Sequence, residues 1–199
     1  AGWQSREVAK DYGDYATTVA KRLGDRIQYW MTLNEIASFC YWGGYGVGRP
    51  GNQPPGIALK TAKERWQVMH NALLAHGTAC QALRAASPGK CHVAPAENYQ
   101  SFVPVIETPA NIAAVRRAFT RETLNGAILM PLLTGRYDEG WIEDHRGEVP
   151  DIAEGDMKII GQPLDGLGAN CYSGNYVQAA DNPKGYEILP MFKTYPKGN

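Results

Sequence analysis

The stretch "YWMTLNEIASFCYWGGYGVGRPG", residues 29–51, joins an apolar run to a single acid and a glycine-rich loop. The run "RIQYWMTL", residues 26–33, lacks regular polar alternation, which is typical of a parallel strand covered on both faces. Asn34 and Glu35 follow where this strand would end. Because loops after strands carry functional groups in many parallel-sheet enzymes, this junction is a candidate site.

Helices and strands are predicted on both sides of this stretch. Residues 90–96 predict a weaker strand, whose end is weakened further by Pro95. A long helix is predicted from about Ala58 to Ala86. Residues 6–23 predict another helix, with an apolar face at three- and four-residue steps: Val8, Tyr12, Tyr15, Val19 and Leu23.

A third helix and a last strand complete the pattern. Thr108 is suited to cap a helix, with Pro109 at its first position, and residues 164–177 predict a strand. This alternation indicates the α/β class with a parallel sheet. Only three strands are strong, whereas a closed barrel takes roughly 250 residues. A doubly wound sheet of three strands would also be small for 199 residues.

The composition favours a folded domain without a charged field. Hydrophobic residues make up 44% of the chain, and its 20 basic and 20 acidic residues cancel. We therefore expect neither nucleic acid nor an anionic membrane as a partner. The apolar runs are shorter than the roughly 20 residues that a membrane span needs.

The cysteines predict a reducing environment. The four of them are too far apart in sequence for a CxxC motif and are expected to be free thiols: Cys40, Cys80, Cys91 and Cys171. With no signal peptide visible, this suggests a cytoplasmic location. The sequence does not begin with Met, which suggests that residue 1 is not the natural start.

Glu35 could be a general acid or a simple loop residue. Apolar and aromatic neighbours would raise its pKa and let it donate a proton near neutral pH. The amide of Asn34 can both donate and accept hydrogen bonds, as a polyhydroxylated ligand requires. From spacing alone, a surface ion pair or a loop cap is the commoner role for a lone acid at a strand end.

The other motifs give weaker indications. "GVGRPG", residues 46–51, matches a nucleotide-binding pattern, but Pro50 and "NQPPG" exclude the helix that must follow. His70 and His76 lie six apart, which does not suit a metal site, and we expect neither a metal nor a cofactor. Aromatic residues after the strand ends could stack on a sugar ring: Trp42, Tyr45 and Tyr172.

Several blocks, in order, resemble the β-glucosidase group, glycoside hydrolase family 1. "YWMTLNE" is similar to the family's T-x-N-E-P acid/base motif. Further blocks resemble the segments that precede and follow this motif in the family: "AGWQSREVAKDYGDYATTVAKRLGDRIQ", "GYGVGRPG", "MHNALLAHGTA", "PLLTGRY" and "PLDGLGANCYSGNYV".

The resemblance implies a TIM (β/α)₈ barrel and a retaining mechanism with two carboxylates about 5 to 5.5 Å apart. Glu35 would be the acid/base at the end of the fourth strand, and Asn34 would bind the sugar 2-hydroxyl. Asn170 and Tyr172 match the family's Asn-x-Tyr on the sixth strand. Asn170 would bind substrate, and the Tyr172 hydroxyl would support the nucleophile.

The chain also departs from the family pattern. It resembles an internal part of the barrel, from about the third helix to the sixth strand, so residues 1–199 would form a single partial barrel domain. The family's N-terminal strands would precede residue 1, and the nucleophile segment would follow residue 199. Ile36 replaces the family's Pro, and Ala37 replaces a Trp that lines the aglycone side in many members.

The resulting expectation is a β-glycosidase, specifically a β-glucosidase acting on β-glucosides or oligosaccharides. The 199 residues alone would be inactive, because the nucleophile is absent. The rest of the barrel would come from the same polypeptide, a companion chain or self-assembly. The alternative is a catalytically inactive homologue that acts as a sugar-binding or assembly module.

Overall fold

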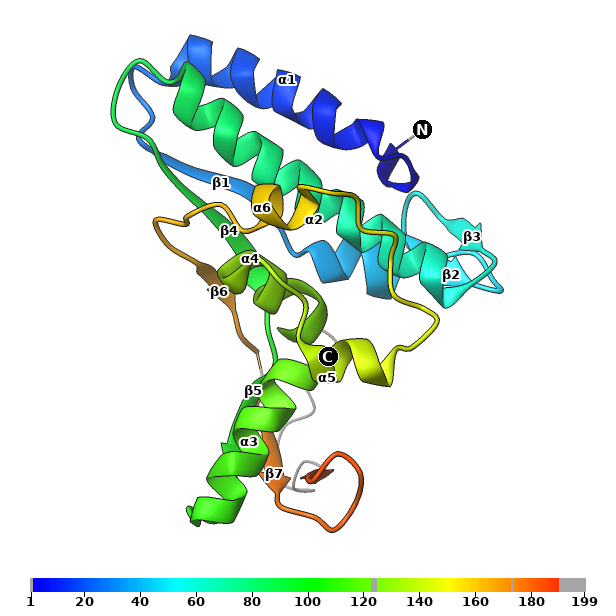
Figure 1. The fold of residues 1–199 in the computed structure, drawn as a ribbon. Coiled ribbons are helices and arrows are strands. Elements are labelled where there is room, and N and C mark those ends of the chain that lie inside the picture. Colours follow the sequence, from blue (N-terminus) through cyan, green and yellow to red (C-terminus); the bar gives the residue numbers. More distant parts are fainter. Residues whose placement is uncertain (1, 123–124, 173, 190–199) are drawn as a thin grey trace.

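The computed structural model describes residues 2–122, 125–172 and 174–189. Figure 1 shows an elongated molecule whose larger part holds a parallel sheet with long helices, and whose smaller part holds a second sheet. Short elements link and extend these parts: η1 (Gly2–Gln4), η2 (Ser38–Gly43), β2 (Tyr45–Val47), β3 (Ile57–Leu59), η3 (Asn125–Leu129), α4 (Met130–Thr134), α5 (Glu139–Asp144) and α6 (Asp156–Ile160).

The larger part is built on three parallel strands, in the order β1 (Tyr29–Asn34), β4 (His92–Asn98) and β6 (Gly168–Asn170). Helices α1 (Glu7–Leu23) and α2 (Ala62–Ala86) lie side by side over one face of this sheet (Figure 1). Helix α2 connects β1 to its parallel neighbour β4. The predicted α/β class is therefore confirmed, and the sheet and its helices form an open arc of a (β/α) barrel.

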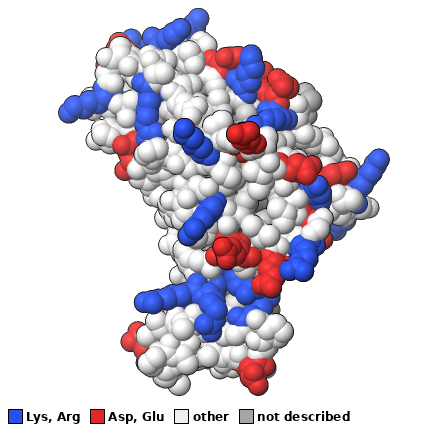
Figure 2. All heavy atoms as spheres, viewed as in Figure 1, with Lys and Arg blue, Asp and Glu red and all other residues white. Residues whose placement is uncertain are grey.

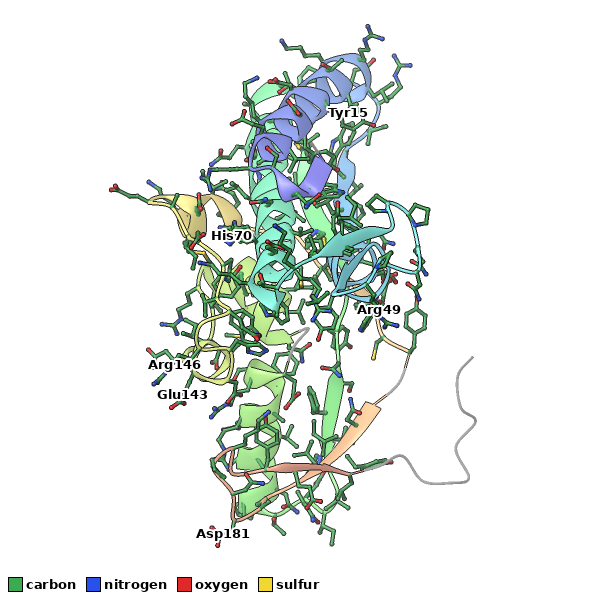
Figure 3. The ribbon with its side chains drawn as sticks, turned by 90° about the vertical axis from the view of Figure 1, so that its right-hand side faces the viewer. Tyr15, Arg49, His70, Glu143, Arg146 and Asp181 are labelled. Atoms are coloured by element: carbon green, nitrogen blue, oxygen red, sulfur yellow. The ribbon has the colours of Figure 1, made fainter. Side chains whose placement is uncertain are left out.

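The helix predicted at residues 6–23 is confirmed as α1, but its predicted apolar face is only partly right, because Tyr12 packs against the core whereas Tyr15 and Leu23 are exposed. Tyr15 is 61% exposed and points away from the molecule (Figure 3). The buried face consists of small residues: Ala9, Gly13, Ala16 and Ala20. A Cβ on Gly13 would lie only 2.7 Å from Thr78 Cγ2 on α2. Small side chains thus allow α1 and α2 to pack closely.

Helix α2 begins at Ala62, later than the predicted Ala58. Residues 57–59 form β3 instead and pair in parallel with β2. Thr61 then caps the helix, because its side chain accepts a hydrogen bond from the amide of Glu64.

The strand predicted at residues 90–96 is confirmed as β4, but it continues through Pro95 to Asn98. The pairing with β1 is regular up to Met31 and Ala94, and its register then shifts before Asn34 pairs with Ala96. Proline cannot donate to a neighbouring strand, and the irregularity accommodates it in the middle of the sheet.

The single strand predicted at residues 164–177 is two strands in different sheets. Its first half is β6, and its second half is β7 (Gly174–Gln178) in the smaller part; residue 173 lies outside the described residues. Strand β7 pairs in parallel with β5 (Ser101–Pro104) and antiparallel with β8 (Glu187–Leu189). The predicted helix after Thr108 is confirmed as α3 (Pro109–Arg121), which Thr108 caps.

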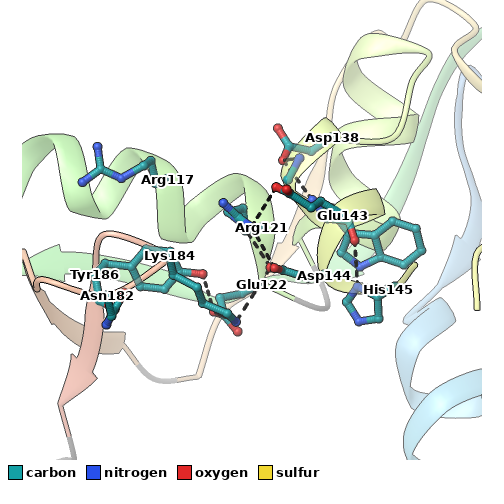
Figure 4. A network of polar contacts seen from close by, with 12 residues as sticks. Arg117, Arg121, Glu122, Asp138, Glu143, Asp144, His145, Asn182, Lys184 and Tyr186 are labelled. Carbon is teal, nitrogen blue, oxygen red and sulfur yellow. Dashed lines mark hydrogen bonds and ion pairs between the residues drawn. The ribbon is translucent and has the colours of Figure 1, made fainter. Parts of the chain in front are cut away.

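The smaller part is joined to the larger one by charged side chains. Arg121, at the end of α3, forms an ion pair of 2.7 Å with Asp144 of α5 (Figure 4). Lys184 lies 3.6 Å from Glu122 in the same network. Elsewhere, Lys and Arg side chains lie among Asp and Glu side chains over the face in Figure 2. In the described ranges, we find no helix with the length and apolar character needed to cross a bilayer.

The prediction that the strand at residues 26–33 is covered on both faces is wrong. Trp30 and Thr32 face the helices, whereas Tyr29 and Met31 on the opposite face are 77% and 63% exposed. Leu167, which precedes β6, is also exposed. The face of the sheet that would line the interior of a closed barrel is therefore open, while the main hydrophobic core lies around α2.

Candidate active site

A pocket of about 400 Å³ lies at the carboxyl ends of β1, β4 and β6. Parallel strands bring the residues that follow them to one edge of the sheet, so segments far apart in sequence meet there. Nine of the described residues line the pocket: Glu35, Ser38, Trp42, Asn98, Tyr99, Gln100, Asn170, Tyr172 and Asn175.

Glu35 is held in an unusual backbone conformation at the end of β1. Its φ is 55°, in the left-handed region that costs a residue other than glycine about 1–3 kcal/mol. The Glu35 amide donates to the carbonyl of Ala96 on β4 at 2.8 Å, and the Ser38 amide donates to the Glu35 carbonyl at 2.9 Å. The chain thus turns sharply at Glu35, and the side chain lines the pocket.

Among the described residues, three side chains donate hydrogen bonds to the Glu35 carboxylate. Asn170 Nδ2 lies 2.8 Å from Oε1, and the Tyr172 hydroxyl lies 3.3 Å from the same oxygen. Ser38 Oγ lies 2.9 Å from Oε2. Each of these donors reaches Glu35 from a different position around the carboxylate, so its orientation in the pocket is restricted.

The structure brings together the four residues singled out from the sequence. Asn170 Nδ2 also lies 3.0 Å from Asn34 Oδ1, so Asn34, Glu35, Asn170 and Tyr172 form one connected group. Tyr172 is 83% exposed, so its ring is available at the pocket mouth. The roles given to these four residues above stay predictions.

The polar residues at and after the carboxyl end of β4 were not predicted from the sequence. Asn98 donates from Nδ2 to Ser38 Oγ at 2.9 Å, while its Oδ1 is buried without a hydrogen-bond partner among the described residues. Gln100 Oε1, also buried, likewise lacks one. Their position in "AENYQ", at the carboxyl end of a parallel strand, was the signal that could have identified them.

Glu97 was missed as well. It is fully buried on β4, behind the pocket lining, and its Oε2 accepts a hydrogen bond from the Ile36 amide at 2.9 Å. A buried acid inside a short apolar strand was a further signal in the sequence.

The aromatic residues proposed for sugar stacking divide between pocket and core. Trp42 is 52% exposed and lines the pocket, as does Tyr172. Tyr45 is only 2% exposed and packs in the hydrophobic core, so the suggestion that it could stack on a sugar is wrong. Ile36 and Ala37 are also fully buried in this core and lie outside the pocket lining.

The glycine-rich loop borders a second hollow rather than the Glu35 pocket. Residues 46–51 contribute to this hollow of about 240 Å³, which also includes Trp42 and Arg65. In the part of the chain that is described, no residue of 46–51 lines the Glu35 pocket.

The two helix histidines have structural partners. His70, on α2, faces the segment that carries α6 (Figure 3), with Tyr137 Oη 2.9 Å from Nδ1 and Asp156 Oδ2 3.1 Å from Nε2. His76 contacts Thr32 Oγ1 and is fully buried, and this burial lowers its pKa to about 4. Within the described ranges, no three His, Cys, Asp or Glu side chains are grouped as metal ligands would be.

Comparison with known proteins links this arrangement to one family. Residues 1–190 match the family model described as glycosyl hydrolase family 1. The chain is 35% identical over 173 residues to a β-glucosidase of Agrobacterium sp., covering 86% of the chain and 36% of the relative. It is 31% identical to β-glucosidase A of Thermotoga maritima over 207 residues, covering 95% and 44%.

Solved structures show the same similarity. The T. maritima family 1 glycoside hydrolase, complexed with a cyclophellitol analogue, matches with a TM-score of 0.73 at 27% identity, covering 99% of this chain and 42% of that one. The virulence factor SghA from Agrobacterium tumefaciens, in complex with its substrate analogue salicin, matches with a TM-score of 0.72 at 28% identity. The match covers 98% of this chain and 42% of SghA. The chain thus spans less than half the length of these relatives.

Proposed function

The chain belongs to glycosyl hydrolase family 1, and from this membership we propose that it supplies the acid/base residue, Glu35, of a retaining β-glucosidase. The substrate is a β-glucoside or an oligosaccharide with a terminal β-D-glucosidic bond. The observation that carries the proposal is the environment of Glu35, a single carboxylate in a pocket lined with amides and aromatic rings. Such a lining suits a sugar, because amides bond hydroxyl groups and rings pack against C–H faces.

Glu35 acts on the leaving group in this proposal. In a retaining enzyme the acid protonates the glycosidic oxygen while a second carboxylate attacks the anomeric carbon, and the same residue later deprotonates the attacking water. The donors on both oxygens of Glu35 hold its carboxyl group at one place during these steps. In this proposal Asn34 and Asn170 bond sugar hydroxyls beside it, which their hydrogen bond to each other next to Glu35 supports.

The nucleophile comes from outside these 199 residues in this proposal. Among the described residues, Glu35 is the only carboxylate in the pocket lining, and the nearby Glu97 is buried behind it. The proposal therefore includes the rest of the barrel as a partner, in the same polypeptide or in another chain. The open inner face of the sheet supports this.

The experiment is a leaving-group series on the polypeptide or assembly that contains this chain. A general acid contributes about 10²–10⁴-fold to a rate, so Glu35→Gln should lower kcat/KM by that range for phenyl β-glucoside. The loss should be far smaller for 2,4-dinitrophenyl β-glucoside, whose leaving group needs no proton. Glu154→Gln, a change at an exposed acid away from the pocket, is the matched control and should leave both rates unchanged.

Two outcomes would contradict the proposal. An equal loss on both substrates would show that Glu35 is not the acid. Binding of glucosides without any hydrolysis in the complete assembly would favour the alternative, a sugar-binding or assembly module.

A further inference from the structure

Glu97 is a fully buried acid, and only one of its two carboxyl oxygens is hydrogen-bonded among the described residues. Its Oε2 accepts from the Ile36 amide at 2.9 Å, while Oε1 is buried without a hydrogen-bond partner among the described residues. Burying a carboxyl oxygen without a hydrogen bond lowers the stability of the fold, so a buried group of this kind calls for an explanation. Its hydrogen-bond partner is the amide that directly follows Glu35.

The backbone at Glu35 is held from β4 by two successive residues. The carbonyl of Ala96 accepts from the Glu35 amide, and the carboxyl of Glu97 accepts from the Ile36 amide. Between these two bonds lies the left-handed φ of Glu35. Because this conformation is unfavourable for glutamate, it persists only where neighbouring contacts hold it.

We infer that Glu97 is a positioning residue for Glu35. Its carboxyl group holds the Ile36 amide, and this bond keeps the turn that directs the Glu35 side chain into the pocket. The expected effect on catalysis rests on the proposed function of Glu35, whereas the hydrogen bond between Glu97 and the Ile36 amide is independent of that function.

The charge state of Glu97 fits this role. Burial raises the pKa of Glu97 to about 8, against the opposing effect of the Ile36 amide, and Glu35 adds to the rise. Glu97 is therefore mainly neutral at pH 7, and it can bond the amide without placing a second charge beside Glu35. Cys40 on η2 is a second titratable group near Glu97. Burial raises the pKa of the Cys40 thiol, and a charge on Glu97 would raise it further.

The test compares Glu97→Leu, which removes the acceptor, with Glu97→Gln, which keeps one. A misplaced catalytic group can lose about 10²-fold in rate, so Glu97→Leu should lower kcat/KM for phenyl β-glucoside by about 10- to 100-fold. The loss for 2,4-dinitrophenyl β-glucoside should be below about 3-fold, because that substrate needs no acid. Glu97→Gln should rescue most of the loss. Glu64→Gln is the control. The Glu64 carboxylate also accepts a hydrogen bond from a backbone amide, that of Lys60, but it lies on α2 and not beside Glu35.

A second readout follows the Ile36 amide by NMR in the full chain. Its proton resonance should move with a midpoint near pH 8 in the wild type, and this movement should be absent in Glu97→Gln but present in Glu64→Gln. An equal loss on both substrates in Glu97→Leu, or an Ile36 resonance that does not titrate, would overturn the inference. If Glu35→Gln itself shows no leaving-group dependence, the proposed function fails, and the Ile36 resonance still decides whether Glu97 holds the turn.

Discussion

Asp156 is a buried carboxylate that connects three segments of the larger part. It accepts hydrogen bonds from Arg6 near the start of α1, from His70 on α2 and from the Ala153 amide. Burial opposes its ionisation, but these donors outweigh burial, and the pKa of Asp156 falls to about 2. The ionised form is therefore the one that stabilises the fold, because the folded pKa lies below the ordinary value.

The pH dependence of stability follows from this shift. Ionised Asp156 should contribute about 2 kcal/mol at pH 7, and this contribution should disappear as the pH falls from about 4 to 2. Asp156→Asn should lower the free energy of unfolding by about that amount at pH 7 and by little at pH 2. Urea unfolding at both pH values measures this, with the exposed Asp14→Asn as the control. Equal losses at pH 7 and pH 2 would contradict the prediction.

The close packing of α2 against α6 depends on a glycine, which has no side chain. Gly77 lies where α2 passes α6, and a Cβ there would be 2.0 Å from the carbonyl oxygen of Ile159 and 2.5 Å from its carbonyl carbon. These are backbone atoms, so the contact can be relieved only by moving α6.

Gly77→Ala should therefore destabilise the fold. Alanine favours the helix by about 1 kcal/mol over glycine, but we expect the clash to outweigh this, with a net loss of about 1–3 kcal/mol. Gly89→Ala is the control, because the nearest atom to its Cβ lies 3.6 Å away. Thermal unfolding of the two variants checks the prediction, and a raised Tm for Gly77→Ala would refute it.

The whole molecule has an apolar face that its own helices do not cover. Tyr29 and Met31 project from the inner face of the sheet, and an uncovered face of this kind favours association. The 199-residue chain produced alone should bind a hydrophobic dye and self-associate in size-exclusion chromatography.

Met31→Gln should weaken this association and dye binding. Ile106→Gln, at a residue 67% exposed that precedes α3 in the smaller part, is the matched control and should change neither. A monomeric chain that binds no dye would show that the inner face is not a docking surface for the rest of the barrel.

The sequence determined the α/β class, the helices α1, α2 and α3 and the strands β1 and β4. The family resemblance implied that Asn34, Asn170 and Tyr172 group with Glu35. The class and these elements depend on short-range patterns: apolar runs, helical periodicity and the cap at Thr108. The same patterns could not predict the small-residue face of α1, because the close packing of α2 selects it. They also could not predict that residues 164–177 divide between two sheets.

Only the tertiary structure decided which further groups surround the acid. Glu97, Asn98 and Gln100 come about sixty residues after Glu35, and they reach it only because β4 lies parallel to β1. The exposure of Tyr29 was decided by which face of the sheet the helices cover, and the burial of Tyr45 by the packing of β2 against the core around α2. The physical reason is that burial and electrostatic environment are properties of neighbours in space, which local sequence does not specify.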